Sequence, residues 1–130
     1  MEILVSQADG RVPVTVFVIR GQINAETAPQ LQAQAEKAIK TGSRHLLFDL
    51  SEAPYISSAG MRVLAYLIVL LRKWSDESQV TARRPGGRSR RSPYLKLLHP
   101  SPDVLRALKM VGFDLFLDIY SDYQEALRAF

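Results

Sequence analysis

Hydrophobic residues in this chain gather in short runs, and the most apolar stretch lies near the middle. Leu46 to Phe48 is a continuous apolar run, which predicts a strand covered on both faces. Asp49 ends the run, and Pro54 marks the following loop. From Val63 to Leu71 the only polar side-chain group is the hydroxyl of Tyr66. We expect a helix that is either deeply buried or in contact with a partner, because this stretch is too short to span a bilayer.

The N-terminal pattern predicts a hairpin. Ile3 to Ser6 is a short apolar run, and Val12 to Ile19 is rich in β-branched residues. Asp9-Gly10 between them is typical of a two-residue turn. Pro13 lies near the start of the second strand, where a missing N–H is tolerated. We therefore expect two antiparallel strands, the first at the edge of a sheet.

A loop and a helix should follow the hairpin. Asn24 is a candidate N-cap, and Thr27 with Gln30 fits a capping box. Pro29 suits the first turn of a helix, and Gly42 is a typical residue at its C-terminal end.

The C-terminal part repeats the alternation of strand and helix. Tyr94 to Leu98 predicts a strand, and Ser101-Pro102-Asp103 predicts the start of a helix that ends at Gly112. Phe113 to Ile119 should contain the last strand, and Ser121 should cap a final helix. The alternation predicts an α/β fold: a mostly parallel five-stranded sheet, with its first strand antiparallel, and four helices.

Composition places these elements in one domain, residues 1–130, because 130 residues with 47% hydrophobic residues suit a single core. There are no cysteines, and we see no secretory signal, so we expect a cytoplasmic protein. Residues 83–96 carry six positive charges and no acidic residue. Since the whole chain carries +4, the remainder carries −2, and the basic character is local. We expect a mobile basic loop at residues 75–93.

The sequence shows no sign of its own catalysis, so we do not expect an enzyme. His45 and His99 are isolated, and no residue pair has metal-ligand spacing. Ser57-Ser58-Ala59-Gly60 lacks the first glycine of a nucleophile elbow, and Gly86-Gly87 lacks the ending of a phosphate-binding loop. We expect neither cofactor nor metal. A serine at a helix start can still be a substrate, because a phosphoryl group there faces unpaired backbone N–H groups.

Several segments resemble the STAS domain family, and most closely its bacterial anti-sigma factor antagonists. The resemblance rests on Asp49-Leu50-Ser51, on Tyr55 to Leu64, on the loop Gly21 to Pro29 and on the spacing from Ser101 to Phe130. It implies that a partner kinase phosphorylates the serine two residues before the glycine, Ser58, with Ser57 as the alternative. Many members have an acidic residue where this chain has Ser57. The implied partner-binding residues are Asn24, Thr27, Tyr55, Ile56, Ser57, Ser58, Ala59, Gly60, Met61 and Arg62.

For function, the resemblance implies a partner-switching phosphoprotein that regulates transcription. The unphosphorylated protein would bind an anti-sigma factor serine kinase and so release a sigma factor. Phosphorylation would end the complex, and a metal-dependent Ser/Thr phosphatase would reset it. A plain capping role for the serines and for Asn24 is the structural alternative. Two other functions stay open at this point: regulation of a membrane transporter complex, and nucleic-acid binding through the basic loop, which would be strongly salt-dependent.

Overall fold

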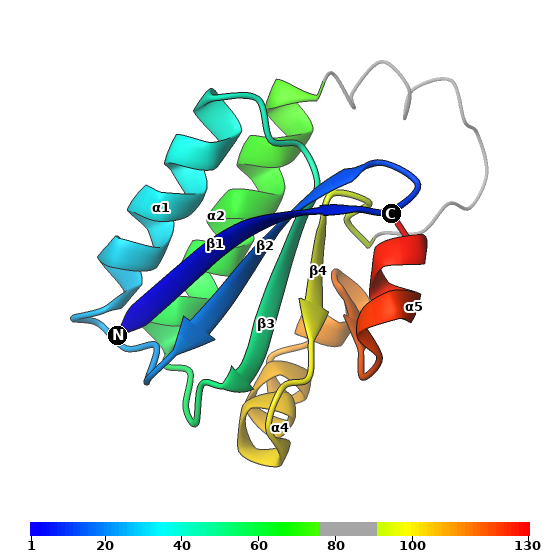
Figure 1. Ribbon diagram of the computed structural model, residues 1–130. Helices are drawn as coiled ribbons and strands as arrows, with labels where there is room; N and C mark the ends of the chain where they lie inside the picture. The colour runs from blue at the N-terminus through cyan, green and yellow to red at the C-terminus, as the bar shows by residue number, and fades with distance from the viewer. Residues whose placement is uncertain (76–90) are drawn as a thin grey trace.

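The computed structural model describes residues 1–75 and 91–130, and a five-stranded sheet runs through its centre (Figure 1). The strands lie side by side in chain order. The first pair is antiparallel, and the other pairs are parallel. This confirms the predicted fold class. The strands are β1 (Glu2–Asp9), β2 (Pro13–Arg20), β3 (Leu46–Glu52), β4 (Leu95–Leu98) and β5 (Asp118–Tyr120).

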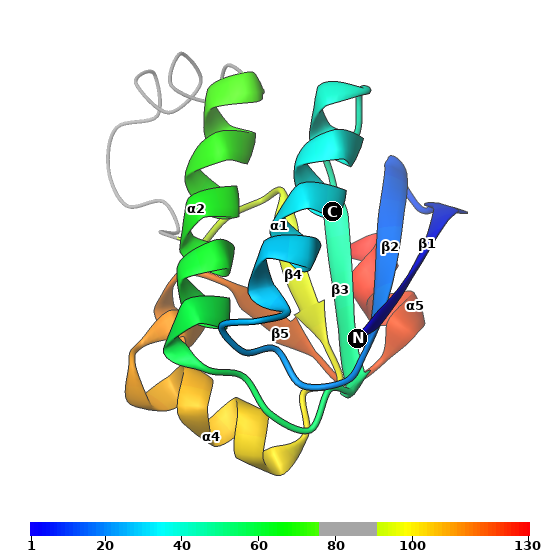
Figure 2. The same cartoon turned by 90° about the vertical axis from the view of Figure 1, so that its left-hand side faces the viewer.

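Four helices of the described chain cover the two faces of the sheet unequally (Figures 1 and 2). They are α1 (Ala28–Lys40), α2 (Ser58–Trp74), α4 (Pro102–Met110) and α5 (Tyr123–Arg128). A short 3₁₀ helix, Phe113–Leu115, precedes β5. Buried residues of α1, α2 and α4 share one hydrophobic cluster with the sheet, whereas α5 forms a smaller cluster on the opposite face. Right-handed crossovers place helices in this way on a parallel sheet.

The central strand β3 is buried as its apolar run predicts. Leu46, Leu47 and Phe48 are fully buried, and the Phe48 ring packs edge-on against Phe17 of β2, with 5.2 Å between ring centroids. The strand extends beyond the apolar run through Glu52, because its backbone pairing with β2 continues after the side chains become polar. Hydrophobic pattern thus located the strand, and backbone pairing set its end.

The hairpin turn differs from the prediction. Asp9 pairs with Pro13, so the loop has three residues, Gly10 to Val12, and not two. A side chain on Gly10 would lie 2.7 Å from the carbonyl oxygen of Leu127 in α5, so this glycine allows a close approach between the hairpin and α5. Local sequence does not reveal this tertiary contact.

The last helix also has a different cap from the one predicted. Asp122, and not Ser121, is the N-cap of α5, and its carboxylate accepts the backbone N–H of Glu125 at 2.8 Å. Ser101 caps α4 as expected, with its hydroxyl accepting the N–H of Val104. The mobile basic loop predicted at residues 75–93 falls mainly on residues 76–90, which lie outside the described residues. Among the described helices, none is long and apolar enough to cross a membrane.

Candidate functional site

The two serines at the start of α2 have different environments. Ser57 is the N-cap, and its half-buried side chain accepts the backbone N–H of Gly60 at 3.3 Å. Ser58 is the first residue of the helix, and its side chain is exposed. Within residues 1–75 and 91–130, its hydroxyl makes no hydrogen bond. The helix therefore uses one hydroxyl for capping and leaves the other open to solvent.

The loop before α1 is tied directly to the loop that carries the serines. Ile23 and Ile56 form an isolated parallel bridge. The N–H of Ile23 donates to the carbonyl oxygen of Tyr55 at 2.9 Å, and the N–H of Ser57 donates to the carbonyl oxygen of Ile23 at 2.8 Å. The backbone thus places the Asn24 loop beside the serine pair, at the end of the sheet where β2 and β3 terminate.

Asn24 and Thr27 shape this loop from within. The side-chain oxygen of Asn24 accepts the N–H groups of Glu26 and Thr27 at 3.0 and 3.1 Å. The Thr27 hydroxyl accepts the N–H of Asn24 at 2.9 Å and donates to the carbonyl oxygen of Gln22 at 2.7 Å. Both side chains are half-buried. The Asn24 side-chain oxygen and the Thr27 hydroxyl are thus engaged within the loop and hold its backbone in place.

The predicted caps of α1 are confirmed only in part. The N-cap is Thr27, the position that the capping box gave it, and not Asn24, but the Thr27 side chain makes no capping hydrogen bond. The capping box does not form, since the Gln30 amide donates to the carbonyl oxygen of Met1 instead. A three-residue Asx turn competes with the helix for these polar groups and delays its start to Ala28.

Two of the residues expected to contact a partner lie beneath the surface. Ile56 is only 2% exposed, and Gly60 is buried. A Cβ atom on Gly60 would lie 2.6 Å from Cγ2 of Ile23 and 2.8 Å from Cγ1 of Ile56. Gly60 thus lets the first turn of α2 pack closely on the bridged loops. These residues support the site but cannot themselves touch a docked protein.

The surface that remains accessible consists of Tyr55, Ser58 and Arg62, with Ala59 and Met61 half-buried between them. The Tyr55 side chain is 51% exposed. Arg62 follows Ser58 by four residues, so the two share one face of α2. We call Tyr55, Ser58 and Arg62 the serine surface.

The serine surface continues into a groove of about 460 Å³ between α1 and α2. Tyr66 closes part of it, and its hydroxyl donates to the Glu36 carboxylate at 2.5 Å. Sequence reasoning missed both of these residues. The spacing of Ser58, Arg62 and Tyr66 at four-residue intervals was the available signal, because it places all three on one helix face.

The apolar part of α2 is both buried and exposed. Its inner face contributes the buried residues Val63, Leu64, Leu67 and Leu71. On the outer face, Tyr66 and Val69 are 40% and 62% exposed. The expectation of deep burial therefore holds for the inner face of α2, and the outer face is exposed.

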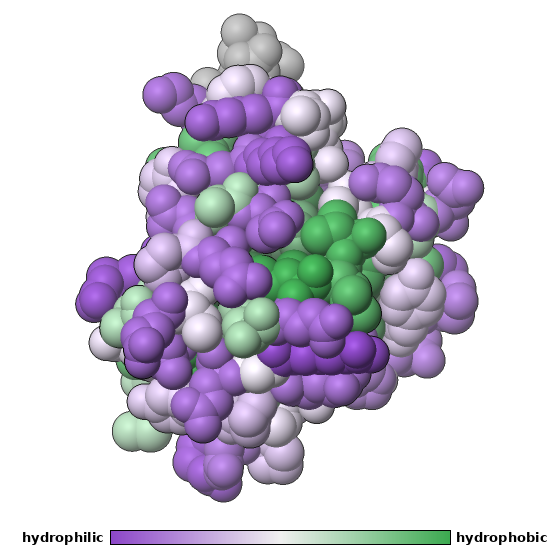
Figure 3. Space-filling model, turned by 60° about the vertical axis from the view of Figure 1, so that its left-hand side comes forward, coloured by the Kyte–Doolittle hydropathy of each residue, from purple (hydrophilic) through white to green (hydrophobic). Residues whose placement is uncertain are grey.

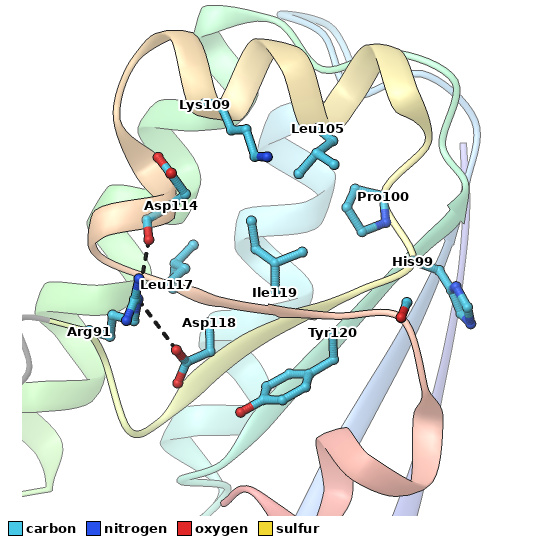
Figure 4. A pocket seen from close by; sticks show the side chains of 11 residues that line it. Arg91, His99, Pro100, Leu105, Lys109, Asp114, Leu117, Asp118, Ile119 and Tyr120 are labelled. Atoms are coloured by element: carbon cyan, nitrogen blue, oxygen red, sulfur yellow. Dashed lines mark hydrogen bonds and ion pairs between the residues drawn. The ribbon is translucent and has the colours of Figure 1, made fainter.

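A second hollow lies far from the serines in the chain, between α4 and β5 (Figure 4). It has a volume of about 560 Å³. On its rim, Arg91 donates to the backbone carbonyl oxygen of Asp114 and pairs with the Asp118 carboxylate at 3.4 Å. Lys109 extends into it from α4 (Figure 4). None of the site residues expected from the sequence lines this hollow.

Residues 1–75 and 91–130 include no group of three residues that could hold a metal ion. His45 directly precedes β3, at the end of the strand that lies away from the serines. Its ring packs against the rings of Tyr94 and Phe130. Burial lowers the pKa of His45, and the charge of Lys96 lowers it further.

Comparison with known proteins shows the family of the chain. The model of the STAS domain family matches residues 5–78, more than half of the chain. The chain belongs to the STAS domain family. The matched range contains most of the hairpin, the Asn24 loop and the whole of α2, so the family assignment rests on the part of the fold that forms the serine surface.

Named relatives of this STAS domain are anti-sigma factor antagonists. BtrV of Bordetella bronchiseptica, a candidate anti-sigma factor antagonist, is 29% identical over 85 residues, which cover 65% of this chain and 71% of BtrV. An anti-sigma factor antagonist from Mycobacterium paratuberculosis has a similar structure, with a TM-score of 0.70 and 23% identity over 98% of this chain and 92% of that one.

The antagonist SpoIIAA in its unphosphorylated form also matches, with a TM-score of 0.61 and 17% identity over 95% of this chain and 92% of that one. The phosphorylated form of SpoIIAA from Bacillus gives a TM-score of 0.56 at 17% identity, covering 96% of each chain. At these identities the structural likeness establishes the fold.

Proposed function

We propose that this STAS domain is an anti-sigma factor antagonist that phosphorylation of Ser58 switches off. The observation that carries the proposal is the difference between the environments of the two serines. Ser57 is engaged in capping α2, whereas Ser58 is exposed and its hydroxyl has no hydrogen-bond partner within the described chain. The similarity to BtrV and to the anti-sigma factor antagonists of known structure supports the same function.

The helix start accepts a phosphoryl group on Ser58 without unfolding. Phosphoserine there lies against the positive end of the α2 dipole and near backbone N–H groups that lack helical partners. The first turn of α2 has no acidic residue to repel it. At the other end of α2, the positive charges of Arg72 and Lys73 stabilise the last turn by interacting with the negative end of the dipole. Phosphorylation thus changes the surface while leaving the fold in place.

The charge change is large enough to switch a complex. A phosphoserine adds about −1.5 to −2 charges at neutral pH. In an interface centred on the serine surface, this charge must be desolvated next to Tyr55, where the unmodified protein presents a neutral hydroxyl. Shifting a population from mostly bound to mostly free needs about 5.5 kcal/mol of differential affinity. Arg62 lies on the same helix face and offsets part of this charge, but a dianion that the partner does not match is of the right order to supply the difference.

The partner is an ATP-dependent anti-sigma factor serine kinase. It contacts the serine surface, the outer surface of the Asn24 loop and the exposed side of α2, with Ile56 and Gly60 holding these parts together from beneath. Docking sequesters the kinase and frees a sigma factor. The kinase then transfers the γ-phosphoryl group of ATP to Ser58 and releases ADP, and a metal-dependent phosphatase in the cytoplasm restores the hydroxyl.

The other two functions gain no support from the described residues. Nucleic-acid binding relied on the basic segment 83–96, most of which lies in residues 76–90, outside the described part of the chain. Regulation of a transporter has no counterpart in the names of the relatives, which are anti-sigma factor antagonists.

The proposal is tested by binding to the anti-sigma kinase encoded in the same genome. Calorimetry should show tight binding for the unmodified chain and a loss of at least a hundredfold for Ser58→Glu, about 2.7 kcal/mol, because the carboxylate imitates part of the phosphoserine charge. Ser51→Glu is the matched control: Ser51 is also exposed but lies at the end of β3, outside the serine surface. Equal affinity of the Ser58→Glu variant and the unmodified chain would refute the switch.

A further inference from the structure

Strand β1 leaves one edge of the sheet open. It pairs with β2 only and forms the outer border of the sheet (Figure 2). Its eight residues, EILVSQAD, include no proline, lysine or arginine, and its register with β2 runs from Glu2 to Asp9 without a bulge. Natural proteins usually protect an exposed edge with such residues, with a bulge or with a covering segment. Between its acidic ends Glu2 and Asp9, β1 has no charged residue, no proline and no bulge.

The alternation of backbone groups along β2 shows which β1 groups point outward. The N–H of Thr15 donates to the carbonyl oxygen of His45, on the β3 side. Alternate residues of a strand bond to opposite neighbours. Val14, Val16 and Val18 therefore bond toward β1, where their register partners are Ala8, Ser6 and Leu4. The backbone groups directed away from the sheet are thus those of Ile3, Val5 and Gln7.

Apolar side chains accompany these free backbone groups. Leu4 is 42% exposed and Val5 is 46% exposed, on opposite faces of the strand. Ile3 is partly buried against the main core. Figure 3 shows an apolar patch at the border between α1 and this edge of the sheet. The edge therefore offers both backbone hydrogen bonds and apolar surface to a second strand.

We propose that the occupant of this edge is β1 of a second copy, paired antiparallel about a two-fold axis at Leu4. In this register Ile3 lies opposite Val5 of the second copy, Leu4 opposite Leu4, and Glu2 opposite Ser6. The outward backbone groups of Ile3 and Val5 then meet each other. Apolar residues face apolar residues on both sides of the joint sheet, as an isologous contact requires.

Other registers match less well. An axis at Ser6 places Ile3 opposite the carboxylate of Asp9, and an axis at Val5 places Ile3 opposite Gln7 and Leu4 opposite Ser6. An axis between Val5 and Ser6 brings Glu2 opposite Asp9, both acidic, and misaligns the outward backbone groups. The sequence of β1 is thus self-complementary about Leu4. A contact through one strand edge is small, so the dimer should depend on protein concentration.

The chain offers a direct test, because it contains no cysteine. Leu4→Cys places two thiols opposite each other at a non-hydrogen-bonded position, where Cα atoms lie about 4.5 Å apart and within disulfide range. Ser6→Cys is the matched control, since Ser6 is exposed on the same face of β1 but lies opposite Glu2. Under mild oxidation we expect Leu4→Cys to form a disulfide dimer several-fold faster than Ser6→Cys. Equal or reversed rates would overturn the register.

Sedimentation analysis tests the dimer itself. We expect the unmodified chain to associate as its concentration rises, and Val5→Lys to remain monomeric, because a lysine at the edge blocks pairing. Val69→Lys is the control, since Val69 is more exposed than Val5 but lies on α2. Circular dichroism confirms that both variants fold. A monomer at every concentration of the unmodified chain, or association that Val5→Lys leaves intact, would overturn the proposal.

Discussion

The backbone N–H of Ser57 donates to the carbonyl oxygen of Ile23 at 2.8 Å. This single bond joins the N-cap of α2 to a loop that precedes it by more than thirty positions in the chain. It fixes where α2 starts relative to the sheet, and therefore where the Ser58 hydroxyl is displayed. The serine surface is thus a property of two bridged loops and not of the helix alone.

Gly60→Ala should destabilise the protein even though alanine favours helices. Helix propensity alone predicts a gain of up to about 1 kcal/mol. The added methyl group, however, would lie within 2.8 Å of both Ile23 and Ile56 side chains. Overpacking of this kind typically costs about 1–3 kcal/mol. We therefore expect a net loss of unfolding free energy in urea denaturation.

The control for this substitution is Ala65→Gly, at an exposed position of the same helix. This control measures the difference in helix propensity between alanine and glycine without a steric conflict. It should lower the unfolding free energy by about 1 kcal/mol. If Gly60→Ala stabilises the protein by the amount that Ala65→Gly costs, the close packing of α2 on the bridged loops does not constrain the chain.

The two serines should respond differently to replacement by alanine. Ser57→Ala removes the oxygen that accepts the Gly60 N–H and should lower the unfolding free energy by about 0.5–2 kcal/mol. Ser58→Ala removes an exposed hydroxyl without a partner in the described chain, so its effect should stay within about 0.5 kcal/mol. Parallel urea titrations measure both. Equal losses for the two variants would contradict the assignment of Ser57 as the cap.

The buried cation Lys96 should depend on Asp118. The Lys96 side chain is 4% exposed, and its ammonium group lies 3.0 Å from the Asp118 carboxylate. Asp118→Asn leaves this charge uncompensated and should cost about 2–4 kcal/mol, a little less than for a fully buried pair because Asp118 is 32% exposed. Lys96→Met should be tolerated within about 1 kcal/mol.

A double variant separates this effect from other contacts of Asp118. Adding Lys96→Met to Asp118→Asn should recover most of the loss, leaving only the contact of Asp118 with Arg91. Thermal or chemical denaturation of the four proteins gives the coupling energy. Additive effects of the two substitutions would show that the ion pair does not contribute as a unit.

Stability should fall in mildly acidic solution because of His45. Its pKa in the folded protein is below the ordinary value of 6.5, through burial and through the charge of Lys96. As the pH falls below about 6.5, the unfolded chain takes up a proton before the folded chain does, so the unfolding free energy decreases. His45→Gln should lose less stability than the unmodified chain between pH 7.5 and 5. Parallel curves for the two proteins would contradict this account.

The pattern of hydrophobic and polar residues predicted most helices and strands, because apolar residues recur in each at the spacing of a helix or a strand. The apolar run at Leu46 to Phe48 and the serine pair before α2 located the central strand and helix, and the alternation gave the correct sheet topology. The resemblance to STAS domains supplied the choice of Ser58, which a helix start alone does not indicate.

What the sequence did not reveal depends on contacts between distant segments. The bridge between Ile23 and Ile56 decides that Ile56 is buried while its neighbour Tyr55 is exposed. In the same way, Lys96 lies in a strand and reads as a surface charge, yet Asp118 and the ring of Phe130 surround it in the fold. Such pairings arise only when the sheet is assembled.

Phosphoryl transfer to Ser58 tests the central claim most directly. The unmodified chain and the variants Ser58→Ala and Ser57→Ala are incubated with the cognate anti-sigma kinase, ATP and Mg²⁺, and intact mass and phosphopeptides are measured. We predict one phosphoryl group on Ser58 in the unmodified chain and in Ser57→Ala, and none in Ser58→Ala. A chain that stays unmodified with an active kinase, or that carries the group elsewhere, would contradict the account.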